Sequence, residues 1–237
     1  MKALLYKEFK LAMHPICYVF IAMFPLMILI PEYPVAIGFI YVLSCYPVLF
    51  LGANKGQQSN DLLFSTLLPV RKKDIVLARI FTVIFMQVAF MAILSALLPV
   101  AITINNSVVA QELAKNPDAT GVGTAGLPLT AFGSILGIVI VGYAIADLIF
   151  FPIYYKHGKS IVMSTLMTIL GFIIYLGVLT IGLPYVPGCK GYVDFLNSTG
   201  DKLWIQFLIL GGGIIISFFL HWLTYKISAK RLEKVDF

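Results

Sequence analysis

The chain has 237 residues, of which 60% are hydrophobic and only 12% are charged. Its mean hydropathy is +0.95. Soluble domains carry roughly 25% charged residues, so this composition excludes a soluble globular protein and indicates an integral membrane protein. The formal net charge of +6 follows from the distribution of basic residues described below, and it is not a signature of nucleic-acid binding.

The first residues predict an interfacial helix over 1–13. Apolar residues at helical spacing oppose three lysines there: Leu4, Leu5, Phe9 and Ala12 against Lys2, Lys7 and Lys10. We expect such a helix to lie along the membrane surface with its basic face toward anionic headgroups.

Six stretches are long and apolar enough, or nearly so, to cross a bilayer as helices, which takes about twenty apolar residues each. They run over about 15–31, 35–53, 75–102, 131–154, 160–183 and 203–225. The first is the weakest because Pro25 lies within it, and we expect it to be short, kinked or tilted. The sequence therefore predicts an all-α integral membrane protein whose 237 residues form a single transmembrane domain.

Basic residues predict the orientation of these spans. With the N-terminus in the cytoplasm of the cell, 14 of the 17 Lys and Arg residues fall on the cytoplasmic side, and Lys115, Lys190 and Lys202 fall outside. Cytoplasmic loops carry this excess of Lys and Arg in membrane proteins. We therefore expect an even number of spans in the plasma membrane, with both termini in the cytoplasm.

One acidic residue, Asp147, lies well inside a predicted span. An ionisable group at that depth is costly and often functional, which leaves three interpretations open. Asp147 could pair with a neighbouring helix, for which Arg79 near the same leaflet is a candidate, take part in the substrate path or gating, or relay protons. The absence of a basic partner deep in another span argues against a proton-coupled pump. We interpret His14, His157 and His221 as interfacial polar residues.

Known catalytic, nucleotide and metal motifs are missing. The tripeptide GKS at 158–160 lacks the first glycine of a phosphate-binding loop, because position 153 is Ile153 and a membrane span precedes it. The three cysteines have no metal-ligand spacing. We therefore expect no catalytic residue, no metal and no cofactor in this chain.

Small residues predict where helices pack closely. Gly133 and Gly137 form a G-x-x-x-G motif, and 211–213 is a run of three glycines. We favour packing within the subunit over dimerisation for the motif.

The segment 54–79 is the cytoplasmic loop long enough to hold structure of its own. Asn60 or Asp61 can cap a short helix, which Pro69 would end, and Asp74 can cap the next span. The apolar residues of this helix are Leu62, Leu63, Phe64, Leu67 and Leu68. We therefore predict that this segment forms a short amphipathic helix on the membrane face, followed by a basic turn. The alternative is that the basic residues only anchor the loop on the cytoplasmic side of the membrane. This alternative explains the charges but not the apolar helix.

Three motifs resemble a known family. They are M-K-x-L-L-x-K-x-F-K at the N-terminus, L-P-V-x-[RK]-K-D-I-V-x-A-[RK] after the second span and F-P-I-Y-Y-K-x-G after the fourth. Together they resemble ABC-2-type transporter permeases, most closely the small six-span permeases of amphipathic-peptide exporters, such as the phenol-soluble modulin exporter and lantibiotic systems. The resemblance covers nearly the whole chain. The outer loop 103–130 looks longer than the family's minimal pattern.

The resemblance implies a type V exporter-like fold in which the loop after the second span is a coupling helix on an ATPase subunit. Carried over to this chain, the ATPase-coupling residues are Asp61, Leu62, Leu63, Phe64, Leu67, Leu68, Arg71, Lys72, Lys73 and Asp74. The second cytoplasmic turn would contribute Lys156, His157 and Lys159. ATP and Mg would then bind to two separate ATPase chains, and a second permease subunit would complete the path.

The expected function is export of amphipathic, membrane-active peptides, with no enzymatic activity in this chain and no nucleic-acid partner. Lipids or drug-like amphiphiles are the alternative substrates, and a non-transporting accessory or immunity protein is a further alternative. A secondary transporter would show inverted repeats and interrupted spans, and a membrane enzyme would show converging acid, His or metal ligands. Neither pattern is evident in the sequence.

Overall fold

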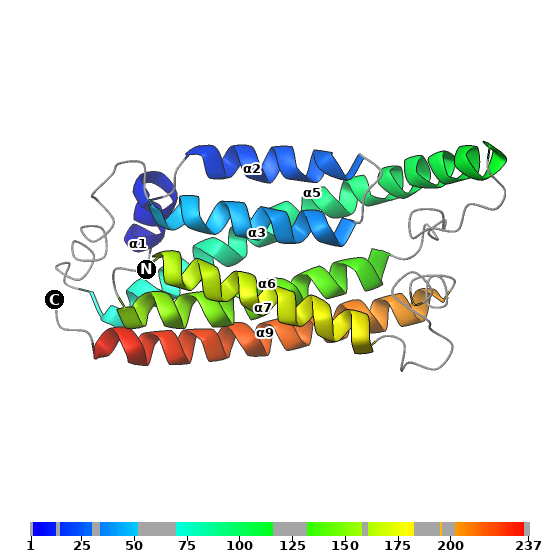
Figure 1. Cartoon of the computed structure of the whole chain (residues 1–237). Helices are drawn as coiled ribbons and strands as arrows, with labels where there is room; N and C mark the ends of the chain where they lie inside the picture. Colours follow the sequence, from blue (N-terminus) through cyan, green and yellow to red (C-terminus); the bar gives the residue numbers. More distant parts are fainter. Residues whose placement is uncertain are drawn as a thin grey trace.

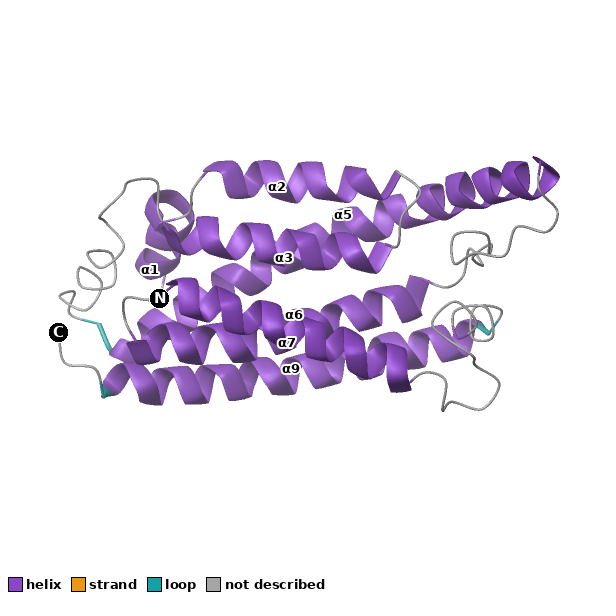
Figure 2. Cartoon of the chain, in the orientation of Figure 1, coloured by secondary structure: helices purple, strands orange, loops and turns teal. Residues whose placement is uncertain are grey.

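The computed structural model describes residues 2–12, 15–29, 34–51, 70–115, 132–157, 161–182, 195 and 202–234. Helices make up nearly all of these residues, and no strand occurs in them (Figure 2). Long apolar segments form helices because a backbone in hydrocarbon must satisfy its hydrogen bonds internally.

The N-terminal part is a helix that meets α2 (Pro15–Leu26) at a sharp bend and packs against α5 (Lys72–Lys115). α1 (Lys2–Lys7) continues as a π-helical turn (Glu8–Ala12), and the axis of Ala3–Lys10 lies at 71° to that of Pro15–Leu26. Its location in the membrane interface stays a prediction. The predicted basic face is wrong in one respect, because Lys7 is buried rather than turned outward; its neighbour Glu8 binds it, as described below.

The six predicted spans each coincide with a helix. These helices are α2 (Pro15–Leu26, followed by a 3₁₀ turn Met27–Leu29), α3 (Pro34–Leu51), α5 (Lys72–Lys115), α6 (Phe132–His157), α7 (Ile161–Gly182) and α9 (Leu203–Glu233). Among the described residues, α5, α6, α7 and α9 are long and apolar enough to cross a membrane, and the bent N-terminal pair could be a fifth span. α2 is short and contains Pro25, as expected. A total of six crossings stays a prediction.

α5 differs from its prediction at both ends. It was expected over 75–102 and instead runs for 44 residues, from Lys72 to Lys115. The prediction followed hydropathy, which locates the membrane and not the end of a helix. Residues 103–115 contain neither Gly nor Pro, so nothing local stops the helix where the apolar run ends. The beginning of the predicted outer loop 103–130 is therefore helical.

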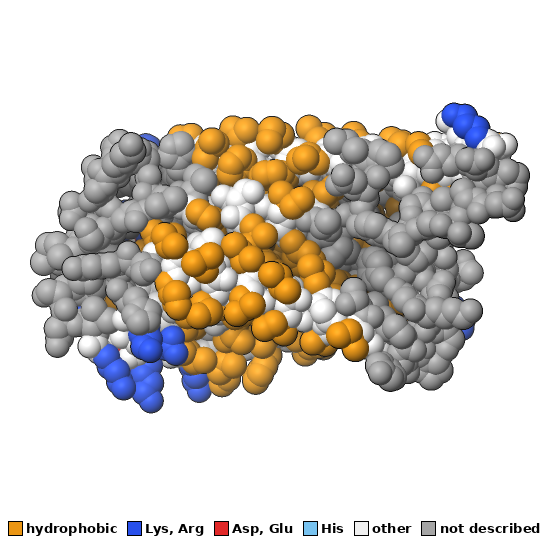
Figure 3. Space-filling view, viewed as in Figure 1, with side chains coloured by type: hydrophobic (Ala, Val, Ile, Leu, Met, Phe, Trp, Pro, Cys, Tyr) orange, Lys and Arg blue, Asp and Glu red, His pale blue; other side chains and the backbone are white. Residues whose placement is uncertain are grey.

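The helices lie side by side in an elongated bundle (Figure 1). α6 packs against α9, α7, α3 and α5, while α2 packs against α3 and α5. Most of the apolar stretch of α6 is buried, whereas α7 and α9 leave much of theirs exposed. On the face shown in Figure 3, hydrophobic side chains cover the middle of the molecule and Lys and Arg lie toward its ends. This distribution suits a protein surrounded by lipid.

The two ends of the described chain lie at one end of the bundle. α1 and the C-terminal end of α9 are close to the start of α5, and the C-terminal end of α5 projects from the opposite end (Figure 1). An even number of crossings would produce this arrangement. The assignment of the first end to the cytoplasm stays a prediction.

Glycines bring α6 and α9 into close contact. A Cβ atom on Gly133 would lie 2.3 Å from the carbonyl oxygen of Gln206, and one on Gly213 would lie 3.1 Å from that of Gly137. No larger side chain fits at Gly133 without moving the backbone of α9. The G-x-x-x-G motif thus packs within the subunit, which confirms the sequence prediction.

Candidate functional site

Asp147 of α6 is the centre of a buried polar cluster that four helices supply. Its side chain is 0% exposed. Tyr46 of α3 donates its hydroxyl to Oδ1. Gln87 Nε2 of α5 lies 3.2 Å from Oδ2 and 2.9 Å from the Tyr46 hydroxyl. His221 Nε2 of α9 lies 2.8 Å from Oδ2. The carboxylate therefore has three donors, which is what a carboxylate in a low-dielectric environment requires.

The surroundings of His221 define its protonation. Nδ1 lies 2.7 Å from the carbonyl oxygen of Ser217, and Nε2 lies 2.8 Å from the carboxylate of Asp147. Both oxygens are acceptors only, so the ring satisfies both by carrying a proton on each nitrogen. The histidine is then a cation paired with the aspartate, and the cluster as a whole is neutral.

This protonation excludes nucleophilic catalysis. Ser217 Oγ lies 3.2 Å from His221 Nδ1, so Ser217, His221 and Asp147 resemble a catalytic triad in composition. A general base needs a free ring lone pair to accept the proton of serine. A doubly protonated ring offers none, and the arrangement is an ion pair that joins α6 to α9.

The structure corrects two interpretations of the sequence. Arg79 was the candidate partner of Asp147, but Arg79 Nη2 lies 3.2 Å from Glu8 Oε1 instead. His221 was interpreted as an interfacial residue, and it is the basic partner that Asp147 was thought to lack. The sequence of α9 contains a periodic pattern that indicates which of its faces is buried. The buried positions of this helix include Gln206, Gly213, Ser217, Thr224 and Ser228. Small and polar residues at helical spacing in an apolar helix indicate the face that packs on a neighbour.

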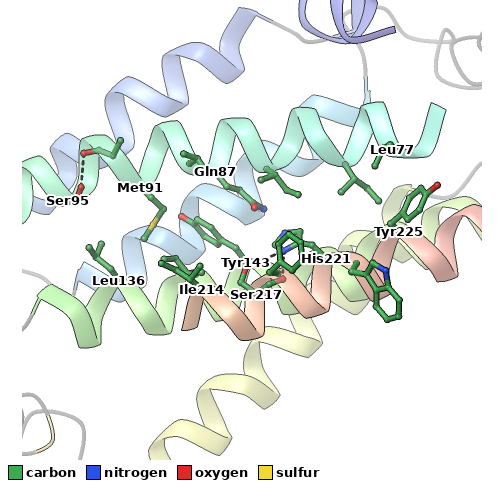
Figure 4. Close-up of a pocket in the computed structure, with 17 residues that line it drawn as sticks. Leu77, Gln87, Met91, Ser95, Leu136, Tyr143, Ile214, Ser217, His221 and Tyr225 are labelled. Carbon is green, nitrogen blue, oxygen red and sulfur yellow. Dashed lines mark hydrogen bonds between the residues drawn. The ribbon is translucent and has the colours of Figure 1, made fainter. Parts of the chain in front are cut away.

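A groove with a volume of about 680 Å³ runs beside the cluster. It lies between α5, which lines it from Leu77 to Ser95, α6 and α9. Its walls are mainly aliphatic and aromatic, and Val88 and Phe218 at its rim are 60% and 78% exposed. Figure 4 shows Gln87, Tyr143, Ser217 and His221 in its middle part, with Leu77 and Tyr225 toward one end and Ser95 and Leu136 toward the other.

A second buried ion pair lies near the start of α5. Glu8 is 2% exposed and Arg79 is 8% exposed. Arg79 Nε forms an ion pair with Glu8 Oε2, and Lys7 Nζ lies 3.6 Å from Glu8 Oε1. The pair fastens the N-terminal helix to α5 two turns after the basic residues Lys72 and Lys73.

The predicted coupling residues are only partly described. Asp61, Leu62, Leu63, Phe64, Leu67, Leu68 and Lys159 lie outside the described residues, so the coupling helix stays a prediction. Arg71 and Lys156 are exposed, and Lys72, Lys73 and Asp74 are half-buried. For His157 the structure describes the backbone, which ends α6. The predicted cap is wrong, because α5 already begins at Lys72 and Asp74 lies in its first turn, where a carboxylate is still favourable.

The last turns of α6, before the predicted second cytoplasmic turn, are tied to α9 at the same end of the bundle. Arg231 Nη1 of α9 donates to the carbonyl oxygen of Pro152 at 2.6 Å. Lys156, one turn further along α6, is exposed beside this contact. The structure thus places one of the three predicted basic residues of this turn at the surface.

Comparison with known proteins gives one match. The family model described as "ABC-2 family transporter protein" matches residues 3–231, nearly the whole chain. The chain has no match among curated proteins or among solved structures. A membrane bundle with a buried polar cluster and an apolar groove suits a transport component with no catalytic role of its own. The chain belongs to the ABC-2 family of transporter proteins.

Proposed function

We propose that this permease subunit of an ABC transporter exports amphipathic, membrane-active peptides. The observation that carries the proposal is the groove between α5, α6 and α9, which is apolar along its walls and bordered by exposed hydrophobic side chains. An amphipathic peptide could enter it from the bilayer with its apolar face against the wall.

The composition of the groove argues against hydrophilic substrates. A sugar or a small ion must exchange its hydration for fixed polar partners. Most of the lining residues are Leu, Ile, Val, Met, Phe and Trp, and the charges of Asp147 and His221 neutralise each other. Lipids and drug-like amphiphiles are also compatible with such a groove and are the second candidate class.

The position of α5 supports coupling to ATP hydrolysis. Family membership implies an ATPase partner, and we propose two copies that dock on residues 54–79 and a second permease subunit that completes the path. α5 begins at the basic turn and, within its next few turns, forms a wall of the groove. A displacement of the turn by an ATPase would therefore move the groove wall directly.

The test is deletion in the native host, followed by challenge with amphipathic peptides and assay of secreted peptides. We expect lower secretion and lower tolerance, both restored by the intact chain. A matched variant, Ala92→Trp, places a bulky ring in the groove and should restore neither. Ala92 is exposed and lines the groove, so the protein can accommodate this ring without repacking its core.

Three outcomes would contradict the proposal in different ways. Loss of tolerance with unchanged secretion would indicate an accessory or immunity protein. Unchanged peptide handling together with altered lipid or drug efflux would move the assignment to the second class. A fall in flux of a hydrophilic solute alone would overturn the substrate class and leave the permease role intact.

A further inference from the structure

We propose that Gln87 is the specificity-determining residue of the groove and that it selects substrates with an uncharged hydrogen-bond donor, such as a carboxamide, within their apolar face. The inference rests on the proposed function, because it names the chemical feature by which an amphipathic peptide would be recognised. The occupant we infer is the apolar face of one amphipathic helix.

Gln87 presents an acceptor to the groove. Its Nε2 donates to Tyr46 and to Asp147, which orients the side-chain amide, because a carboxylate accepts from the nitrogen and not from the oxygen. Its Oε1 has no hydrogen-bond partner among the described residues, and Gln87 lines the groove. An acceptor held in place by two bonds on its own amide is ready for a donor from a ligand.

Tyr143 is a second polar residue in the same part of the groove lining. It lines the groove from α6, and its ring points toward α5 in Figure 4. Its side chain is 2% exposed and its buried hydroxyl has no hydrogen-bond partner among the described residues. Buried polar groups without partners are uncommon in folded proteins, but a Cβ atom on Gly38 of α3 would lie 3.4 Å from this hydroxyl. The hydroxyl therefore faces α3, and the polar contact of the groove rests on Gln87.

The charges around Gln87 select against ionised groups. A lysine of the substrate would approach the cation of His221, which also lines the groove. A carboxylate would approach the acceptor of Gln87 and the anion of Asp147. Asp147 and His221 already satisfy each other, so neither is available to neutralise a new charge. A neutral donor meets no such penalty.

The length of the groove indicates an elongated occupant. Its lining residues on α5 extend from Leu77 to Ser95, about 27 Å at 1.5 Å per residue. Gln87 is about 15 Å from the first and about 12 Å from the second by the same rise, so the polar contact is near the middle. An amphipathic helix of similar length, apolar at both ends of its buried face and interrupted once in the centre, matches this pattern.

The test uses the full-length chain in lipid nanodiscs and a set of labelled model helices of Leu, Ala and Lys. The probes differ at one central position of the apolar face, which carries Asn, Leu or Lys. Asn and Leu have similar size, and an Asn amide is less easily satisfied within its own helix than a Ser or Thr hydroxyl. Partitioning of each probe into empty nanodiscs is subtracted, which removes differences in membrane affinity.

We expect the Asn probe to bind about fivefold more tightly than the Leu probe, because one neutral hydrogen bond contributes about that much to binding. The Lys probe should bind most weakly. In Gln87→Met, which keeps the length of the side chain and removes the acceptor, the preference for Asn should disappear. If this variant fails to fold, the comparison of the Asn and Leu probes on the unchanged protein still tests the inference. Ala92→Trp should weaken the binding of all three probes equally.

Equal binding of the Asn and Leu probes would overturn the inference and leave peptide export standing. Binding that is insensitive to Ala92→Trp would show that the groove is not the binding site. Efficient cross-linking between two chains through Val88→Cys in native membranes would assign the groove to a dimer interface. If the probes behave as expected but the complete transporter moves no amphipathic peptide, the proposed function fails and the binding site remains.

Discussion

Two buried ion pairs among the described residues differ in position and surroundings. Glu8 and Arg79 join the N-terminal helix to the start of α5, and Lys7 adds a second positive charge beside them. Asp147 and His221 join α6 to α9 in the interior of the bundle, where Tyr46 and Gln87 complete the coordination of the carboxylate. In the first cluster two cationic side chains contact the carboxylate of Glu8, and in the second His221 contacts the carboxylate of Asp147.

The difference follows from what each location offers a charge. Near the end of a bundle, long Arg and Lys side chains can extend toward water when they lose a partner. In the interior no such route exists, and every charge needs a partner and further hydrogen bonds. We therefore propose that the first pair transmits movement from the basic turn and that the second stabilises the region next to the groove.

Removing Asp147 should have the largest effect on stability. Asp147→Leu leaves His221 charged and unpaired and takes the acceptor from Tyr46 and Gln87. We expect the free energy of unfolding in detergent to fall by about 3–5 kcal/mol. Asp147→Asn, which keeps the shape and one acceptor, should cost less. Denaturation monitored by circular dichroism or by thermal aggregation measures both.

The control for this prediction is the double variant Asp147→Leu with His221→Leu. Because both charges are removed together, the loss should be smaller than the sum of the two single losses. Strictly additive losses would mean that the pair is not coupled and that the cluster is not the ion pair described above.

Glu8→Ala should be less destabilising and more damaging to coupling. Arg79 and Lys7 can turn toward the membrane surface, so we expect a loss of about 1–2 kcal/mol in stability. Transport and stimulated ATP hydrolysis in the reconstituted transporter should fall further than stability explains. Lys10→Ala, an exposed position on the same N-terminal segment, is the matched control and should change neither. A stability loss as large as that of Asp147→Leu would contradict the comparison.

Replacing Arg71, Lys72 and Lys73 together by alanine should leave stability within about 0.5 kcal/mol, as surface substitutions usually do. These residues are exposed or half-buried. If they contact the ATPase, its stimulated hydrolysis should drop while membrane insertion is unchanged. Lys230→Ala with Lys234→Ala changes exposed charges at the same end of the bundle and serves as the control. Normal turnover in the triple variant would reduce the basic turn to a topology anchor.

Cysteine labelling should sharpen the comparison without affecting stability, the smallest effect of the four. In a chain lacking native cysteines, a cysteine at Ser107 should react with an impermeant reagent from outside, and one at Lys72 only after permeabilisation. The two positions lie near opposite ends of α5. External reaction at position 72 would reverse the assignment of the first ion pair to the cytoplasmic side.

Hydropathy located the helices well and their ends poorly. Each predicted span coincides with a helix, because an apolar run must form one in lipid. The ends of α5 and α9 lie beyond the apolar runs, at Lys115 and Glu233, where helix propensity rather than hydrophobicity decides. The coupling helix over Asp61 to Leu68 lies outside the described residues and remains a prediction.

The sequence alone determined the membrane class and the approximate positions of the helices, and it singled out Asp147, since these inferences depend on composition and on the cost of one buried charge. Only the tertiary structure decided which side chains pair with Asp147 and with Arg79. Residues 46, 87, 147 and 221 lie on four helices, and no local pattern states which faces meet. Close packing at Gly133 and Gly213 brings α6 against α9, and that contact places His221 beside Asp147. Arg79 pairs with Glu8 instead, and Gln87 of α5 lines the groove.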